Sequence, residues 1–175
     1  FYRDWYEKLH ADGIDFVKVD GQSSFWNFAE NSLPIGPAAK GIHQALEGGA
    51  SYMDGAIINC MGMAAENMFS RPQTAVARNS DDFVPKREDG FAEHLLQNAY
   101  NTPYQGELYV CDWDMFWTSH EDGLRHSLLR AISGGPVYFS DRIGETAPEV
   151  AAPLCYADGR LPRLLRAARP TQDCM

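Results

Sequence analysis

Short apolar runs alternate along the chain with longer segments in which apolar residues recur at helical spacing. The runs IDFVKV at 14–19 and AIINCM at 56–61 are bounded by glycine and polar residues. Such runs predict buried strands. A shorter strand is predicted at 76–78, and further strands within 107–116 and at 136–141.

The intervening segments carry apolar side chains three and four residues apart, the spacing of an amphipathic helix. In the first of them Trp5, Tyr6 and Leu9 share one face, and Gly13 ends the pattern. Glycine pairs end two of the others, as expected for helix C-termini. The predicted helices cover 1–12, 37–50, 91–101 and 121–134, with a last helix or helical turn at 146–157.

This alternation predicts an α/β protein with a parallel sheet and helical crossovers. Polar residues follow each predicted strand, and the carboxyl ends of strands build the active sites of open α/β sheets and (β/α)8 barrels. Five strands are too few for a complete barrel, which needs at least about 200 residues. We therefore expect the C-terminal part, about strands 4–8, of a (β/α)8 TIM barrel at 1–160, and the start of a C-terminal β domain at 161–175.

The composition narrows the range of partners. The chain is 45% hydrophobic and 22% charged, which is typical of a globular domain. Its formal net charge of -9 argues against nucleic acid and anionic membrane as partners, but it does not oppose a neutral sugar. No apolar run reaches the roughly 18 residues that span a bilayer.

The cysteines and histidines predict neither a metal site nor a cofactor. The four cysteines form no C-x-x-C pair, and the five histidines form no H-x-x-x-H or H-E-x-x-H pattern. Disulfides are not required, which favours the cytoplasm as the compartment. The chain begins at Phe1 rather than Met, so its first residues say nothing about a leader.

The first candidate site follows the first predicted strand, in DFVKVDGQ. Lys18 and Asp20 are two residues apart and therefore share one face of a strand. Either they form a buried ion pair, or both face a polar pocket. Two carboxylates flanking a glycosidic bond are the minimal equipment of a glycosidase, and a neighbouring cation favours an ionised nucleophile. A structural salt bridge explains the same spacing, so both interpretations stay open.

The second candidate site lies in RNSDDF, directly after the strand at 76–78. Arg78 precedes Asp81 by three residues and Asp82 by four. A planar guanidinium can bind sugar hydroxyls or hold a carboxylate. The structural alternative is that one of the aspartates caps a helix N-terminus. Because the segment follows a strand, as the first site does, it strengthens the hypothesis of a shared active site.

A third group lies in CDWDMF, where Asp112 and Asp114 share one face and Trp113 faces the other way. A tryptophan near a sugar site often stacks on the ring, and a core tryptophan is the alternative. In SGGPVYFSD the glycines indicate close packing and a turn into the strand, while the role of Asp141 stays open.

These motifs together resemble one family. Seven motifs follow one another along the chain: KVDGQ, INCMGMAAEN, RNSDDF, QNAYN, CDWDMFWTSH, RAISGGPVYFSD and PTQDC. In this order they resemble the motifs of the raffinose synthase and alkaline α-galactosidase (seed imbibition protein) group of glycoside hydrolase family 36. The resemblance covers nearly the whole chain, and SGGPVYFSD and DWDMF are its most distinctive motifs. It implies a (β/α)8 catalytic barrel between two β domains, and galactosyl chemistry with net retention.

The resemblance also implies residue roles. The family's Lys-x-Asp motif falls on Lys18 and Asp20, which makes Asp20 the expected nucleophile. Its Arg-x-x-x-Asp motif falls on Arg78 and Asp82, which makes Asp82 the expected general acid/base, with Asp81 as a rival. Lys18 and Arg78 are then expected to bind galactose hydroxyls. The further substrate-binding residues that it implies are Asp81, Asp112, Trp113 and Asp114.

The expected function is hydrolysis or transfer of α-galactosyl groups of raffinose-family oligosaccharides or galactinol through a covalent galactosyl-enzyme, with water or a sugar as acceptor. The even spacing of strands, without a large insertion, favours a compact α-galactosidase-like enzyme. The alternative is a non-catalytic carbohydrate-binding relative, against which the intact motif residues count. No G-x-G-x-x-G or G-x-x-x-x-G-K loop supports a nucleotide-binding enzyme. We expect the chain alone to be inactive and poorly soluble, because an opened sheet exposes edges and apolar surface.

Overall fold

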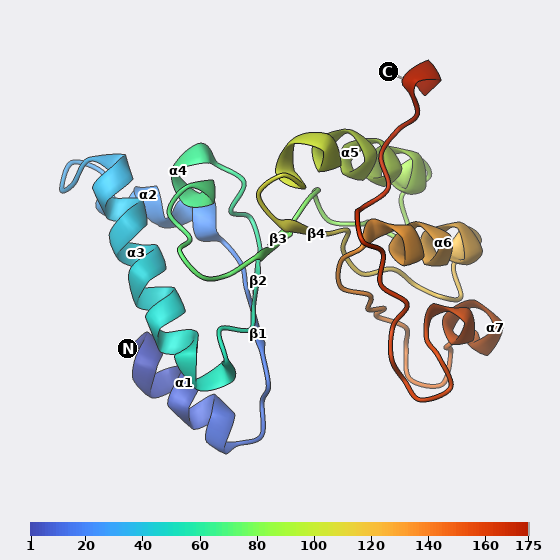
Figure 1. Cartoon of the computed structure of the whole chain (residues 1–175), viewed down its shortest axis with the longest axis horizontal. Coiled ribbons are helices and arrows are strands. Elements are labelled where there is room, and N and C mark those ends of the chain that lie inside the picture. The colour runs from blue at the N-terminus through green and yellow to red at the C-terminus, as the bar shows by residue number, and fades with distance from the viewer. Residues whose placement is uncertain (175) are drawn as a thin grey trace. The chain divides into compact units, whose positions relative to one another are not determined.

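The computed structural model describes residues 1–174 and divides into two compact units. Unit 1 covers Phe1–Arg78, and unit 2 begins at Asn79. Strands alternate with helices along unit 1, and unit 2 carries one strand between two long helices, which confirms the α/β prediction (Figure 1). The extension of this pattern to part of a TIM barrel stays a prediction.

Unit 1 is built on three short parallel strands in the order β1-β2-β3. Parallel neighbours need long crossovers, and helices supply them here. The strands are β1 (Val17–Val19), β2 (Ile57–Asn59) and β3 (Val76–Arg78); the helices are α1 (Tyr2–Ala11), α2 (Trp26–Ala29), α3 (Ile35–Gly49) and α4 (Ala65–Met68), with 3-10 turns at Gln22–Phe25 and Ala50–Met53.

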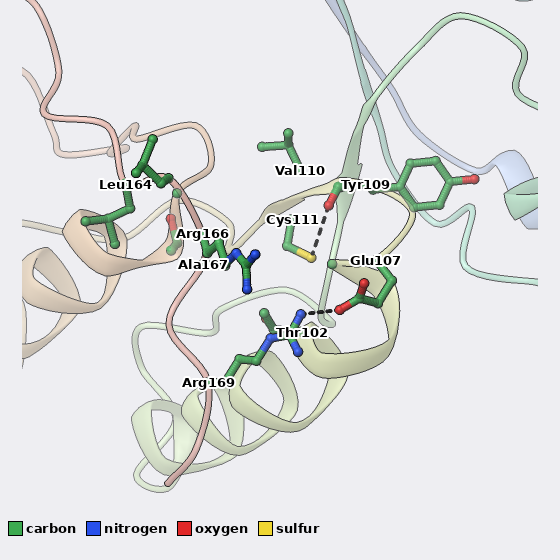
Figure 2. Close-up of a pocket in the computed structure, with 13 residues that line it drawn as sticks. Thr102, Glu107, Tyr109, Val110, Cys111, Leu164, Arg166, Ala167 and Arg169 are labelled. Atoms are coloured by element: carbon green, nitrogen blue, oxygen red, sulfur yellow. Dashed lines mark hydrogen bonds and ion pairs between the residues drawn. The ribbon is translucent and has the colours of Figure 1, made fainter.

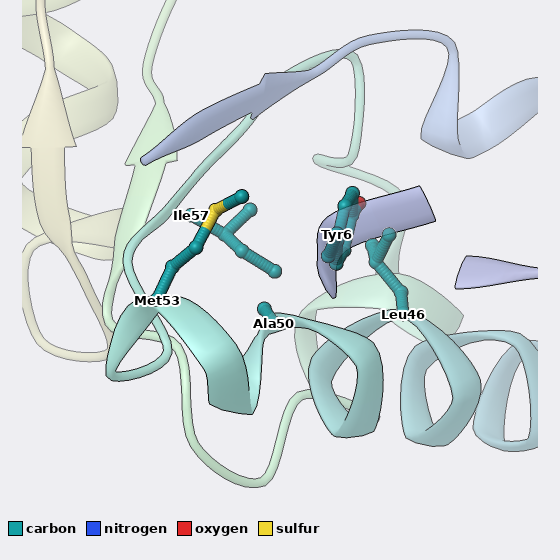
Figure 3. Packing of buried hydrophobic residues seen from close by; sticks show 5 residues of the cluster. All are labelled: Tyr6, Leu46, Ala50, Met53 and Ile57. Carbon is teal, nitrogen blue, oxygen red and sulfur yellow. The ribbon is translucent and has the colours of Figure 1, made fainter. Parts of the chain in front are cut away.

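The core of unit 1 lies between the strands and the two longer helices. Figure 3 shows Tyr6 of α1 and Leu46 of α3 facing Ile57 of β2. Val17 and Val19 of β1 pack against the same cluster. Because side chains alternate along a strand, Lys18 and Asp20 belong to the opposite face of the sheet.

Unit 2 carries two long helices and a single described strand. Its core brings Phe83, Phe116 and Leu154 together. Gly134 adopts a φ of 73° and ends the second long helix, as its sequence predicts. The elements are α5 (Gly90–Gln105), β4 (Val110–Asp112), α6 (Gly123–Ser133) and α7 (Pro148–Ala151), with 3-10 turns at Ala152–Leu154 and Gln172–Cys174.

The predicted strand at 136–141 is wrong. That segment makes one parallel bridge, between Phe139 and Phe116. Pro136 has no N–H to offer a ladder, and Asp114 adopts a φ of 66°, so the chain after β4 leaves the extended conformation. Too few consecutive residues are therefore aligned for a strand.

The C-terminal part of the described chain is irregular. The predicted helix at 146–157 is shorter, since α7 and the following 3-10 turn cover 148–154. The assignment of 161–175 to a further β domain stays a prediction. No helix within residues 1–174 combines the length and the apolar character needed to cross a membrane.

Candidate active site

The carboxyl ends of β1, β2 and β3 bring two candidate site residues and a cysteine into line. Val19 pairs with Asn59, and Asn59 pairs with Ala77. Asp20 follows Val19, Cys60 follows Asn59, and Arg78 follows Ala77. These three residues therefore lie at the same level of the sheet edge.

Cys60 links the other two side chains. Arg78 Nη1 donates to Cys60 Sγ at 3.8 Å, and the Asp20 carboxylate lies close enough to act on the thiol. Burial, followed by the interaction with Asp20, raises the pKa of the Cys60 thiol to about 11. Lys18 is close enough to act electrostatically on the same thiol. Cys60 is therefore a neutral S–H group at pH 7, and it can donate to a carboxylate and accept from a guanidinium at once.

The exposure of these side chains excludes one interpretation of the KVD motif. Lys18 and Asp20 are exposed, whereas Arg78 is only 2% exposed. A buried ion pair between Lys18 and Asp20 is therefore wrong, and both side chains lie on an accessible face.

Asp20 Oδ1 accepts the backbone N–H of Gly21 at 2.7 Å, and Gly21 adopts a φ of 68°. A glycine supplies this left-handed turn without strain.

The segment that carries Asp81 and Asp82 is held from both sides within unit 2. The Asp81 N–H donates to Gln97 Oε1 at 2.8 Å, and the Phe83 N–H donates to Asp114 Oδ2 at 2.8 Å.

The side chains of Asp81 and Asp82, the two candidates for the acid/base role, are exposed. They do not cap the following helix, because the N-cap of α5 is Asp89. This rules out the structural alternative for RNSDDF.

Asp112 and Asp114 are buried and take part in structural hydrogen bonds. Asp112 Oδ1 accepts the Asp114 N–H at 2.9 Å, and Asp112 Oδ2 accepts the Tyr138 hydroxyl at 2.8 Å. The backbone N–H of Asn79 donates to the Asp112 carbonyl at 2.9 Å. These bonds fix the end of β4 beside the segment that leads to Asp82. A direct role of either aspartate in sugar binding stays a prediction.

Trp113 is 2% exposed, and its indole N–H donates to Thr102 Oγ1 of α5 at 3.2 Å. This position agrees with the core interpretation of the residue. Its role in stacking on a sugar stays a prediction.

A polar cavity of about 400 Å³ lies elsewhere in unit 2 (Figure 2). The cavity lies against the start of β4, where Tyr109 and Cys111 line it. Asp112 is the last residue of that strand and does not line the cavity. An ion pair between Glu107 and Arg169 lies among its lining residues. None of the predicted site residues lines this cavity, so its position does not identify the predicted site.

Cys60 is a candidate site residue that the sequence did not reveal. Its importance depends on the register of three strands, which are distant in the sequence. Cys60 falls inside the predicted strand at 56–61, whereas in the structure it directly follows β2, as Asp20 directly follows β1. In the described part of the chain, no three His, Cys, Asp or Glu side chains form a group that could hold a metal ion.

Comparison with known proteins identifies the family. The model of the family described as raffinose synthase or seed imbibition protein Sip1 matches residues 1–175. The chain is 36% identical over 176 residues to the probable galactinol–sucrose galactosyltransferase 1 of Arabidopsis thaliana, covering 99% of this chain and 23% of that protein.

Two pea proteins are also similar. The chain is 39% identical over 178 residues to the galactinol–sucrose galactosyltransferase of Pisum sativum, covering 95% of this chain and 22% of the relative. It is 35% identical over 111 residues to the stachyose synthase of the same plant, covering 59% of this chain and 13% of the relative. The chain thus spans about a quarter of the length of the relatives that it matches over nearly its whole length. It belongs to the raffinose synthase and seed imbibition protein family.

Proposed function

We propose that this chain is part of a retaining α-galactosyl enzyme that transfers galactose from galactinol to sucrose. The names of the Arabidopsis and pea galactosyltransferases support this donor and this acceptor. The observation that carries the proposal is the line of Asp20, Cys60 and Arg78 at the carboxyl ends of three parallel strands. Active sites of α/β folds are built at such strand ends.

In the first step, the Asp20 carboxylate forms a bond to the anomeric carbon of galactose. The bond between that carbon and the leaving oxygen breaks, and the Asp82 carboxyl donates its proton to the oxygen. The products are a covalent galactosyl-enzyme and free inositol. Lys18 and Arg78 bind galactose hydroxyls in this proposal.

In the second step, Asp82 takes a proton from a sucrose hydroxyl, and the sucrose oxygen displaces Asp20 from the anomeric carbon. Two successive inversions at one carbon give net retention. If water replaces sucrose, the same carboxylates hydrolyse the donor. Asp81 is the rival for the acid/base role, and Asp112, Trp113 and Asp114 are proposed to shape the pocket.

The direct test uses the product of the complete open reading frame that encodes this chain. It is incubated with galactinol, with and without sucrose, and the sugars are separated by chromatography. We expect a new trisaccharide that depends on sucrose and disappears in Asp20→Ala. Asp15→Ala, a matched change of an exposed aspartate just before β1, is expected to keep the activity.

The other outcomes assign other functions. Free galactose instead of a trisaccharide, lost in Asp20→Ala, would identify a hydrolase with the same nucleophile. Binding of sugars by folded wild-type protein without any turnover would support the non-catalytic carbohydrate-binding relative.

Azide distinguishes the two carboxylate roles. With an aryl α-galactoside that has a good leaving group, Asp20→Gly plus azide is expected to give β-galactosyl azide, because azide replaces the missing nucleophile. Asp82→Gly plus azide is expected to give α-galactosyl azide, because azide attacks the intact β-linked galactosyl-enzyme. The anomer is read by proton NMR. If Asp81→Gly rather than Asp82→Gly gives the α product, Asp81 is the acid/base.

A further inference from the structure

We propose that Gln22 is a positioning residue for Asp20, and that it acts through a chain of hydrogen bonds with a half-buried cation at one end and a buried carboxylate at the other. This inference rests on the proposed function, because it assumes that Asp20 reacts. Gln22 lies two residues after Asp20 and is 6% exposed.

Gln22 holds the turn that contains Asp20 from two directions. Its Nε2 donates to the carbonyl of Val19, the residue before Asp20, at 3.1 Å. Its backbone N–H donates to the carbonyl of Cys60 at 3.4 Å. Asp20 and Gly21 thus lie between two fixed residues. Val19 before them is held by the side chain of Gln22, and Gln22 after them is held by its backbone bond to Cys60. Such a clamp restricts the orientation of the carboxylate that must reach the anomeric carbon.

The side chain of Gln22 is also the middle of a longer chain. Arg71 Nη2 donates to Gln22 Oε1 at 2.9 Å, and Gln22 Nε2 donates to Asn59 Oδ1 at 2.8 Å. Asn59 Nδ2 donates to Thr74 Oγ1 at 3.0 Å, and Thr74 Oγ1 donates to Glu47 Oε1. Every donor points the same way, from the guanidinium to the carboxylate. Hydrogen bonds aligned in series polarise and strengthen one another.

The chain is buried from Gln22 to Glu47 and lies behind the catalytic face. Asn59 is 1% exposed and Glu47 of α3 is 1% exposed. The Glu47 carboxylate also accepts the backbone N–H groups of Thr74 at 2.9 Å and of Gln73 at 3.1 Å. The chain thus ties Gln22 to helix α3 and to the start of β3. Displacement of Gln22 would leave buried polar groups without partners, which keeps the turn rigid.

Gly62 makes room for this arrangement. A Cβ at Gly62 would lie 1.9 Å from Arg71 Nη2 and 2.8 Å from Gln22 Oε1. Its carbonyl accepts the same Arg71 Nη2 at 2.8 Å. A methyl group at this position would therefore push the guanidinium away from Gln22, so that Gly62→Ala disturbs the chain without changing any of its members.

The experiment compares Gln22→Met and Gly62→Ala with wild type in the complete protein. Gln22→Met keeps the length of the side chain and removes its hydrogen bonds. Gln44→Met, at an exposed glutamine of α3, is the matched control. Two quantities are measured: amide hydrogen exchange of a peptide covering residues 17–25, and kcat and KM for transfer from galactinol to sucrose.

In both test variants, we expect exchange at residues 17–25 to rise by about tenfold or more, with exchange in α5 unchanged. We expect kcat to fall by about 10- to 100-fold and KM to change by less than about threefold, because misplacement of a reacting group lowers the rate of the chemical step. The control is expected to match wild type in all measurements.

Unchanged exchange in the test variants would overturn the clamp. Faster exchange with an unchanged kcat would overturn its catalytic meaning. Wild-type protein without any galactosyl activity would refute the proposed function and with it the catalytic role of Gln22. The exchange data would then still decide whether Gln22 orders the turn. If Gln22→Met does not fold, as judged by near-UV circular dichroism, Gly62→Ala provides the decisive comparison.

Discussion

His126 is fully buried in unit 2, in an environment that accepts only a neutral imidazole. Its ring centre lies 4.1 Å from that of Phe83 and 4.9 Å from that of Phe91. Arg130 Nη1 lies 2.9 Å from His126 Nδ1, so Nδ1 accepts this bond. Burial, with smaller contributions from the charges of Arg130 and His120, lowers the pKa of His126 to about 3.

This burial predicts a loss of stability in mild acid. In the unfolded chain a histidine has a pKa of about 6.5, so between about pH 6.5 and 3 the unfolded state binds the proton and the folded state does not. The stabilisation is complete above about pH 6.5 and declines as the pH falls. From pH 7 to pH 5 we expect the free energy of unfolding to drop by about 2 kcal/mol from this residue.

Urea unfolding at the two pH values tests this expectation. His126→Gln leaves Arg130 an acceptor but cannot take up a proton at these pH values, so its pH dependence should be weaker by about 2 kcal/mol. His10→Gln, at an exposed histidine of α1, is the control and should keep the wild-type pH dependence. An equal pH dependence in His126→Gln and wild type would contradict the account.

At the scale of elements, close backbone approaches in unit 2 are made at glycines. A Cβ on Gly135 would lie 2.1 Å from the carbonyl oxygen of Cys111 in β4. This contact supports the structural interpretation of the glycines in SGGPVYFSD. The turn after α6 thus packs directly on the backbone of β4.

We expect Gly135→Ala to destabilise the protein by about 2 kcal/mol or more, because the added methyl group must displace backbone atoms. Gly41→Ala in the exposed interior of α3 is the matched change, since a Cβ there has no atom within 4 Å. It should stabilise by up to about 1 kcal/mol through helix propensity. The two variants are compared by their midpoints in urea; effects of the same sign would contradict the prediction.

The sequence predicted those parts of the fold and the site that depend on local periodicity. Alternation along a strand places Lys18 and Asp20 on one face whatever the tertiary structure, and apolar spacing defines the long helices. The contribution of Cys60 depends on strand register, and the absence of a strand at 136–141 depends on the turn at Asp114. Both are set by contacts between segments far apart in the sequence, which periodicity does not encode.

At the scale of the whole molecule, much apolar surface of the isolated chain faces solvent. Ile143 and Leu165 are completely exposed, and Phe28 is 89% exposed. The relatives that the chain matches over nearly its full length are about four times longer. Exposed apolar side chains in such number are typical of surfaces that other parts of a protein cover.

We therefore expect the 175-residue chain alone to show no galactosyl transfer and to aggregate, whereas the product of the complete open reading frame is soluble and active. Size-exclusion chromatography and the galactinol–sucrose assay test both statements. A monomeric 175-residue protein with normal turnover would contradict the expectation.

The space at Gly62 has a consequence for the history of the family. An alanine there is compatible only with a side chain at position 71 that does not reach Gln22. An alanine at position 62 and an Arg71–Gln22 hydrogen bond therefore exclude each other. In natural relatives, we expect a residue larger than glycine at position 62 to accompany a residue other than arginine at position 71 more often than chance, so that the two sites vary as a pair.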